Sequence, residues 1–253
     1  MDPIGRTPRL WDSALANLAP FITCWITQLT NMSEHGTIRS ELRNLKVLEG
    51  PAEKCDFSTF PPAPDEAFRK WLKEAIEAGV KEPHAMTLST VDEDGCPDAR
   101  VLILKNVDAR GWHFAIKGNS PKGVQLAGNP NAALTFYWPD QGRQIRIRGK
   151  AVALPDDECE RDFADRPLSS KIAALGSKQS QVLQDVDEIE KNMKAARQEF
   201  EDNVNMVLSD WKVYAVLPNA VEFWQGSKDR LHQRLQYRRD SAGQQWEKQL
   251  LWP

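Results

Sequence analysis

The stretch WQGSKDRLHQR, residues 224–234, places Arg230, His232 and Arg234 at every second position. Alternate residues of an extended strand point to opposite faces, so these three side chains would line one face over roughly 13 Å. We therefore expect a strand over residues 229–237 that presents a row of hydrogen-bond donors to a flat, anionic ligand. A solvent-exposed edge strand carrying the same charges is the alternative that this pattern leaves open.

Six other short motifs follow one another along the chain. They are RVLILK at residues 100–105, SPK at 120–122, GRQIRIRG at 142–149, RP at 166–167, SKQS at 177–180 and LWP at 251–253. With the stretch at 224–234, they resemble the signatures of the pyridoxamine 5'-phosphate oxidase family, flavoenzymes that bind FMN in a dimeric split β-barrel. The resemblance covers roughly residues 66–253. It implies an FMN-binding split β-barrel of the antiparallel Greek-key type.

Residue periodicity independently indicates a mainly β chain with added helices, the α+β class. Strands are expected at residues 85–91, 98–106, 111–117, 132–138, 143–154, 210–216, 221–225, 229–237 and 246–251. Helices are expected at residues 37–49, from a cap at Asp65 to Gly79, at 155–164 and at 181–203. Closely spaced strands joined by short turns favour an antiparallel sheet or barrel.

The length of 253 residues and the 41% hydrophobic content suit one large β-rich domain. We expect residues 1–36 to be an extension that is disordered or a non-native start, residues 37–64 an N-terminal arm, and residues 65–253 the split-barrel oxidase domain. The formal net charge of -3 gives no general electrostatic reason to bind nucleic acid or an anionic membrane.

The four cysteines are widely scattered and form no C-x-x-C pair, which argues against a zinc site and a disulfide framework. We interpret them as reduced thiols of a cytoplasmic protein. The apolar residues 14–29 are too short for an ordinary membrane span of about 20 residues. The sequence has no G-x-G-x-x-G after a strand, no P-loop and no H-E-x-x-H, so a Rossmann site, a P-loop and a zincin are disfavoured and no metal is expected.

Two groups of residues could hold a phosphate. Arg100 and Lys105 bracket the apolar run VLIL, which predicts a buried strand with a cation at each end. Ser120 and Lys122 open an expected helix, whose N-terminal N–H groups favour an anion. The alternatives are a strand with solvated ends and a plain N-cap at Ser120. The resemblance implies FMN binding by Arg100, Val101, Leu102, Lys105 and Lys122, with Lys105 also contacting substrate.

The resemblance assigns roles to further residues. It implies FMN contacts from Gln144, Gln179, Ser180, Trp224 and Arg234, with Gln179 and Ser180 supplied by the partner subunit. It implies substrate contacts from Lys105, Arg166, Ser170, Arg230 and His232. Arg230 and His232 would be catalytic: they would position the substrate ring and stabilise developing charge, and His232 could assist a proton.

The chain departs from the family pattern at three places. Pro121 stands where the family commonly has an arginine, Ala115 and Ile116 where it has a Tyr-Thr pair, and Asp162 where it has a phosphate-binding tyrosine. A carboxylate next to a phosphate is repulsive unless a cation lies between them. Asp162 therefore indicates a substrate without that phosphate or a local shift in alignment.

These observations lead to one functional hypothesis and two alternatives. The resemblance implies an FMN-dependent oxidase that converts pyridoxamine or pyridoxine 5'-phosphate to pyridoxal 5'-phosphate, with O2 as acceptor and H2O2 as product. Its expected partners are the small-molecule substrate, O2 and a second copy of the chain that shares the FMN sites. The alternatives are a related flavin oxidase that acts on another ring, as in phenazine pathways, and a non-catalytic FMN- or pyridoxal phosphate-binding protein.

Overall fold

The computed structural model describes residues 38–48, 54–240 and 245–253, and the chain divides into two compact units, Met1–Val47 and Leu48–Pro253. In the first unit, helix α2 (Ile38–Asn44) lies inside the range expected to be helical and is shorter than expected. The expected extension at residues 1–36 lies outside the described residues.

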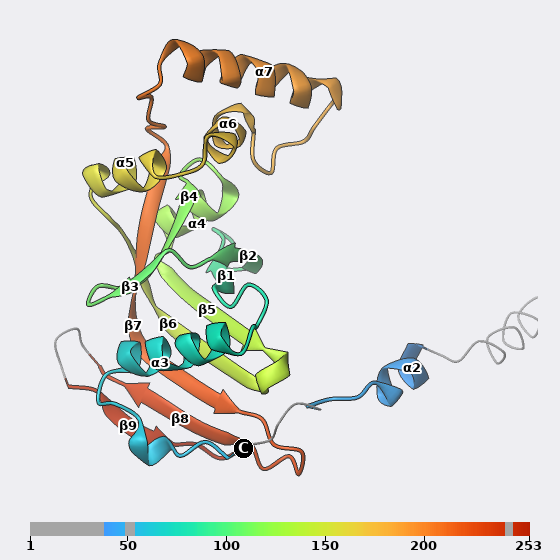
Figure 1. Cartoon of the computed structure of the whole chain (residues 1–253), viewed down its shortest axis with the longest axis vertical. Helices are drawn as coiled ribbons and strands as arrows, with labels where there is room; N and C mark the ends of the chain where they lie inside the picture. Colours follow the sequence, from blue (N-terminus) through green and yellow to red (C-terminus); the bar gives the residue numbers. More distant parts are fainter. Residues whose placement is uncertain (1–37, 49–53, 241–244) are drawn as a thin grey trace, which may run out of the picture. The chain divides into compact units, whose positions relative to one another are not determined.

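The second unit is built on one antiparallel sheet (Figure 1). Its strands are β1 (Ala85–Val91), β2 (Pro97–Ile103), β3 (Asn106–Asp108), β4 (Gly111–Lys117), β5 (Asn131–Trp138), β6 (Arg143–Ala153), β7 (Trp211–Gln225), β8 (Gln233–Arg238) and β9 (Glu247–Leu250). The order across the sheet is β2-β1-β5-β6-β7-β4-β3, with β8 paired to β7 and β9 to β8. The antiparallel sheet and the α+β class are confirmed.

The two end strands of this order, β2 and β3, follow each other directly in the chain, so the sheet curls into a barrel. At the junction, the Leu104 N–H donates to the His84 carbonyl at 2.8 Å, which extends the β1–β2 pairing. The next residue, Lys105, donates its N–H to the His113 carbonyl at 2.8 Å, which extends the β3–β4 pairing. We call residues 103–106 the seam, because both edges of the sheet meet there.

Strand β7 was expected as two strands, at 210–216 and 221–225, and is one strand of 15 residues. Pro218 and Asn219 interrupt the hydrophobic pattern, but β6 runs beside β7 past this point through a register shift between Arg148 and Gly149. On its other edge, β7 pairs first with β4 and then with β8. Pro218, which lacks an N–H, falls in the gap between the two partners.

The strand expected over 229–237 begins only at Gln233, so the expected row of three side chains on one strand face is wrong. Residues before it form a turn, in which the Asp229 carboxylate accepts the Leu231 N–H at 2.9 Å and the Ser227 hydroxyl at 2.5 Å. Arg230 in this turn has a left-handed φ of 68°. A carboxylate that bonds nearby backbone favours a turn over a strand ladder, and here it does so.

The expected strand at 98–106 is divided at the seam into β2 and β3, and β2 is not the buried strand that the run VLIL predicted. Val101 is 68% exposed and Ile103 is 45% exposed in the single chain, whereas Leu102 and Leu104 pack against the core. The alternation typical of a strand with one solvent-facing side is therefore what the run encodes.

Helices cover the barrel and extend it at one end. They are α3 (Pro64–Glu77), α4 (Pro121–Gly128), α5 (Asp156–Ala164), α6 (Leu168–Gly176) and α7 (Asp187–Asp202), with short 3-10 turns at Phe57–Thr59 and Pro139–Gln141. Helix α3 buries Phe68 and Trp71 in the main core. It begins at Pro64, after Ala63, so the expected cap at Asp65 is wrong and Asp65 lies in the first helical turn.

Helices α5, α6 and α7 gather around the start of β7, where Phe163, Phe200 and Trp211 form a second, smaller core (Figure 1). Helix α5 agrees with the expected range, and α6 was not predicted. Helix α7 starts six residues later than the expected residue 181. The Asp185 carboxylate accepts the Asp187 N–H at 3.0 Å and forms a turn before the helix. Among the described helices, none is long and apolar enough to cross a membrane.

Candidate functional site

Most of the predicted site residues lie in three clusters, together with neighbouring residues that they contact. The Lys122 cluster comprises Thr90, Arg100, Lys122, Gln125 and Gln179; the Lys105 cluster comprises Lys105, Asp162, Arg166, Ser170 and Trp211; and the Trp224 cluster comprises Gln144, Glu222, Trp224, His232 and Arg234. The first two lie where α4, α5 and α6 meet the sheet, and the third lies where β8 pairs with the end of β7 (Figure 1).

Lys122 is a buried cation in the first turn of α4, with only 5% of its surface exposed. Its Nζ donates to Ser120 Oγ at 3.3 Å and to Gln179 Oε1 at 3.1 Å, both of which are neutral. Burial lowers the pKa of the Lys122 ammonium, and the charge of nearby Arg100 lowers it further. Ser120 occupies the N-cap position but its hydroxyl donates to the Lys117 carbonyl at 2.6 Å, so it does not cap α4.

Arg100 is tethered beside Lys122 by neighbours on β1, β2 and α4. Its Nη1 donates to Thr90 Oγ1 at 2.6 Å, and its Nη2 donates to Gln125 Oε1 at 3.3 Å and bonds Asp98. Thr90 Oγ1 in turn lies 2.5 Å from Gln125 Oε1. The Arg100 guanidinium is thus fixed in place, next to an ammonium that forms no ion pair with a carboxylate within the described part of the chain.

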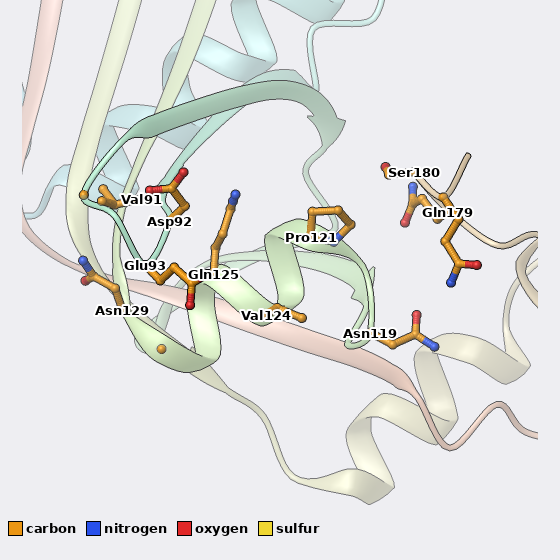
Figure 2. Close-up of a pocket in the computed structure, with 13 residues that line it drawn as sticks. Val91, Asp92, Glu93, Asn119, Pro121, Val124, Gln125, Asn129, Gln179 and Ser180 are labelled. Carbon is orange, nitrogen blue, oxygen red and sulfur yellow. The ribbon is translucent and has the colours of Figure 1, made fainter. Parts of the chain in front are cut away.

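A cavity of about 770 Å³ opens beside this cluster. Figure 2 shows Val91 at the end of β1 and Asp92 of the following turn on one side, Gln125 on α4 near them, and Gln179 and Ser180 across from Pro121. Gln179 accepts a hydrogen bond from Lys122 of the same chain, and the contact of Gln179 and Ser180 with a partner subunit's cofactor stays a prediction.

The Lys105 cluster surrounds the indole of Trp211. Asp162 on α5 accepts the Trp211 Nε1–H at 2.8 Å and forms an ion pair with Lys105 Nζ at 3.5 Å. The Arg166 guanidinium stacks on the face of the same indole, 4.1 Å from the ring centre. The cation that a phosphate beside Asp162 would require is therefore present.

Arg166 has unused hydrogen-bonding capacity. Its Nη2 donates to the Ser170 carbonyl at 3.3 Å, and its Nε is buried with no hydrogen-bond partner among the described residues. Burial lowers the pKa of Arg166, and Asp162 partly opposes this effect. A buried donor without an acceptor is costly, so an anionic ligand would satisfy it.

The Trp224 cluster lies across three paired strands, with Trp224 opposite Gln144 on one side and Arg234 on the other. The His232 ring lies 4.8 Å from the Trp224 ring, and His232 Nδ1 accepts the Ser227 N–H at 3.0 Å. The neutral imidazole therefore carries its proton on Nε2.

Arg234 donates to Glu222 Oε1 at 2.9 Å and to the Trp252 carbonyl at 2.9 Å, while Arg230 is exposed in its turn. Thirteen residues of strand separate Trp211 from Trp224, or roughly 40 Å at 3.3 Å per residue. One chain therefore brings Arg100 and Lys122 together, and Lys105 with Arg166, while most of β7 lies between Trp211 of the Lys105 cluster and Trp224.

Three further positions behave differently from the family pattern. Ile116 is buried in the main core and Ala115 packs against the second core, so both are structural in this chain. Pro121 lines the cavity at the first position of α4, where its missing N–H is not needed by the helix. Thr90, Gln125 and Trp211 were not anticipated as members of the site.

The donors of the Lys122 cluster fit the phosphate of a nucleotide-like cofactor such as FMN. A buried ammonium, a fixed guanidinium and a helix N-terminus are the groups that bind phosphate in proteins, and a cavity lies beside them. Because the ammonium is already desolvated, a dianion placed next to it would relieve an electrostatic cost.

A curled antiparallel barrel with this cluster at a strand–helix junction defines the FMN-binding split-barrel class of folds. Residues 72–200 match the family model described as pyridoxamine 5'-phosphate oxidase, and residues 211–253 match the pyridoxine 5'-phosphate oxidase C-terminal dimerisation region. The chain belongs to the pyridoxamine 5'-phosphate oxidase family.

Named relatives agree with this assignment. The pyridoxine/pyridoxamine 5'-phosphate oxidase of Pseudomonas fluorescens is 43% identical over 196 residues, which cover 76% of this chain and 90% of the relative. The protein of the same name from Thermosynechococcus vestitus is 40% identical over 222 residues, covering 88% of this chain and all (100%) of the relative.

Two solved structures are similar in fold. PhzG from Burkholderia lata, in complex with tetrahydrophenazine-1-carboxylic acid, superposes with a TM-score of 0.73 at 30% identity and covers 81% of this chain and 99% of PhzG. A pyridoxamine 5'-phosphate oxidase-related, FMN-binding protein from Nostoc punctiforme gives a TM-score of 0.60 at 15% identity, covering 77% of this chain and 100% of that one. At that identity the second likeness concerns the fold alone.

Proposed function

We propose that this protein is a cytoplasmic FMN-dependent oxidase that converts pyridoxamine or pyridoxine 5'-phosphate to pyridoxal 5'-phosphate, with O2 as acceptor and H2O2 as product. The observation that carries the proposal is the buried Lys122 ammonium, which lies beside Arg100 and donates hydrogen bonds to the neutral side chains of Ser120 and Gln179. Relatives at 40–44% identity carry the corresponding enzyme name.

In this proposal Arg100 and Lys122 hold the phosphate of FMN, while Val101, Leu102, Lys105, Gln144, Gln179, Ser180, Trp224 and Arg234 supply the remaining cofactor contacts. When bound, FMN accepts two electrons from the substrate carbon and passes them to O2. The chain contributes binding, orientation and charge. Gln179 already bonds the Lys122 ammonium at 3.1 Å and would exchange that bond for one to the cofactor.

The substrate anion is assigned to Lys105, Arg166 and Ser170, with Arg166 Nε as the donor that gains an acceptor on binding. Arg230 and His232 are assigned to the substrate ring, where the Nε2–H of His232 can donate a proton or hydrogen bond because Nδ1 accepts the Ser227 N–H. The length of β7 between Trp211 and Trp224 supports a site to which a second copy supplies Arg230 and His232.

We therefore propose a homodimer in which each site combines the Lys122 and Lys105 clusters of one chain with the Trp224 cluster of the other. The support is the separation of the Lys105 and Trp224 clusters along β7 and the match of residues 211–253 to a dimerisation region. This arrangement would also cover the exposed Val101 and Ile103 side chains if they lie at the contact.

The purified protein tests the function directly. We expect it to be yellow, to lose its flavin absorbance under anaerobic pyridoxamine phosphate, and to release one H2O2 per pyridoxal phosphate when O2 is admitted. Lys122→Met should lose flavin, whereas His232→Gln should keep flavin and lose turnover. Colourless protein that cannot be loaded with FMN would refute the proposal.

A second candidate is supported by one observation, the Asp162 carboxylate inside the Lys105 cluster. It would suit a flavin oxidase acting on a ring that bears a different anion. Flavin reduced by another ring substrate but not by pyridoxamine phosphate would favour that reading, and bound flavin without turnover on any reduced ring would favour a non-catalytic binding protein.

A further inference from the structure

Asp162 lies within a cluster whose other charged members are both cations. Its carboxylate is 3.5 Å from Lys105 Nζ, and it is close enough to Arg166 to influence the pKa of that guanidinium. Lys105 and Asp162 are mostly enclosed, with 27% and 20% of their side chains exposed. With one carboxylate and two cations, the cluster carries a net charge of one positive unit.

The carboxylate is held in this position by the protein. Trp211 donates its Nε1–H to Asp162 Oδ2 at 2.8 Å and presents its ring face to Arg166, so one indole fixes both groups. Trp211 is itself buried against Phe163 and Phe200 in the second core. Asp162 therefore cannot turn away from an entering anion without leaving a buried N–H unpaired.

We propose that Asp162 determines the charge selectivity of the substrate site: by lowering the net positive charge of the site, it reduces the advantage that a phosphate dianion has over a ligand with a single negative charge. The inference rests on the proposed function, because it assigns the Lys105 cluster to the substrate. It adds to the phosphorylated substrates a second ligand class, aromatic rings that bear a carboxylate or another single negative charge.

The size of the effect follows from Coulomb's law. The Asp162 charge repels a dianion twice as strongly as a monoanion at the same position. If removal of this charge lowers the dissociation constant of a monoanion by a given factor, it should lower that of a dianion by the square of that factor. For a separation of about 6 Å and an effective dielectric constant of about 40 to 80, the factor is roughly three- to tenfold per unit of ligand charge. The expected gain for a dianion is then roughly ten- to a hundredfold.

Two matched ligands measure this selectivity. Benzoate and phenyl phosphate present the same ring with one and, above pH 8, about two negative charges. Their dissociation constants are measured by calorimetry on the purified protein, with whatever flavin it carries, for the wild type and for Asp162→Asn. The asparagine keeps an oxygen that can accept the Trp211 N–H and removes only the charge.

We expect Asp162→Asn to tighten benzoate about three- to tenfold and phenyl phosphate by the square of the factor found for benzoate. The control is Asp157→Asn, an acidic residue on the same helix whose side chain is 72% exposed, and it should change neither constant by more than about twofold. Melting temperatures of all three proteins establish that each is folded.

Three results would overturn the inference. They are an equal increase in affinity for both ligands in Asp162→Asn, weaker binding of phenyl phosphate to that variant, and no binding of either ligand to wild type or variant. These outcomes are separate from the test of the proposed function. If the protein oxidises pyridoxamine phosphate but the factor for phenyl phosphate is not the square of the factor for benzoate, the proposed function stands and the role of Asp162 is refuted. If the squared relation is found but the protein shows no flavin chemistry, the role of Asp162 stands and the proposed function is refuted.

Discussion

Replacing Lys122 by methionine should weaken FMN binding and at the same time stabilise the protein without FMN. The side chain has nearly the same shape, so only the charge and its hydrogen bonds are lost. A charge-assisted hydrogen bond to a phosphate is worth about 1.5–3 kcal/mol, which corresponds to a dissociation constant raised roughly 10- to 150-fold. Titration of apo-protein with FMN, followed by quenching of flavin fluorescence, measures this change.

The stability of the apo-protein should move the other way. Burial and the charge of Arg100 lower the Lys122 pKa, so the charged form destabilises the folded state. We expect Lys122→Met to raise the free energy of unfolding of the apo-protein by about 0.5–1 kcal/mol. In the wild type, this cost is present at neutral pH and is relieved as the pH rises through the lowered pKa of Lys122, and the variant should lose that dependence.

Lys122→Met is therefore expected to weaken FMN binding and to stabilise the apo-protein. Lys73→Met, at an exposed lysine of α3 with a 77% exposed side chain, is the control and should change neither quantity appreciably. If Lys122→Met lowers the stability of the apo-protein, Lys122 is a structural residue held by Ser120 and Gln179. If FMN affinity is unchanged, the phosphate lies elsewhere.

Three further predictions concern other parts of the molecule. Partial burial acts to raise the pKa of Asp108, but hydrogen bonds from Arg110 outweigh it and the pKa falls to about 2, so stability gained above pH 4 is lost as the pH drops toward 2. Asp108→Asn should therefore cost about 1–2 kcal/mol of unfolding free energy at pH 7 and little at pH 2, as measured by urea denaturation; an equal cost at both pH values would contradict the assignment. Tyr237→Phe removes a 2.8 Å hydrogen bond to the Pro61 carbonyl and should cost about 1 kcal/mol in the same assay, with flavin content unchanged. Arg166→Lys keeps the charge but loses the stacked plane and the buried Nε, and should lower kcat/KM for pyridoxamine phosphate roughly tenfold or more in steady-state assays; wild-type kinetics would show that Arg166 does not contact the substrate.

Much of the sheet could be predicted from local pattern alone. Strands β1, β4, β5 and β6 fall within a residue or so of their expected bounds, because each shows alternation or an apolar run between turn residues. The errors occur where one side chain or one distant partner decides the structure. Asp229 turns the chain where alternation predicted a strand, and β6 carries β7 through Pro218 where the sequence predicted a break.

The site was predictable only in part, for the same reason. Lys122 and Arg100 stand out chemically, as cations beside a helix start and a strand. Thr90 and Trp211 have no such signal, because their roles depend on partners 35 and 49 residues away, Gln125 and Asp162. The sequence also does not indicate that Lys105 is paired with a carboxylate, since that pair joins the seam to a helix that is remote in the chain.

The seam constrains how such a protein can change during evolution. Because Leu104 continues one edge pairing and Lys105 begins the other, inserting or deleting a residue between positions 103 and 106 would shift the register on one side or both and exchange inward and outward faces. The position of the Lys105 backbone is therefore inaccessible to the loop-length variation by which many enzymes acquire new substrates. Helix α5 lies outside this constraint, so a substitution at Asp162 could change the ligand charge that the site accepts without altering the register of the sheet.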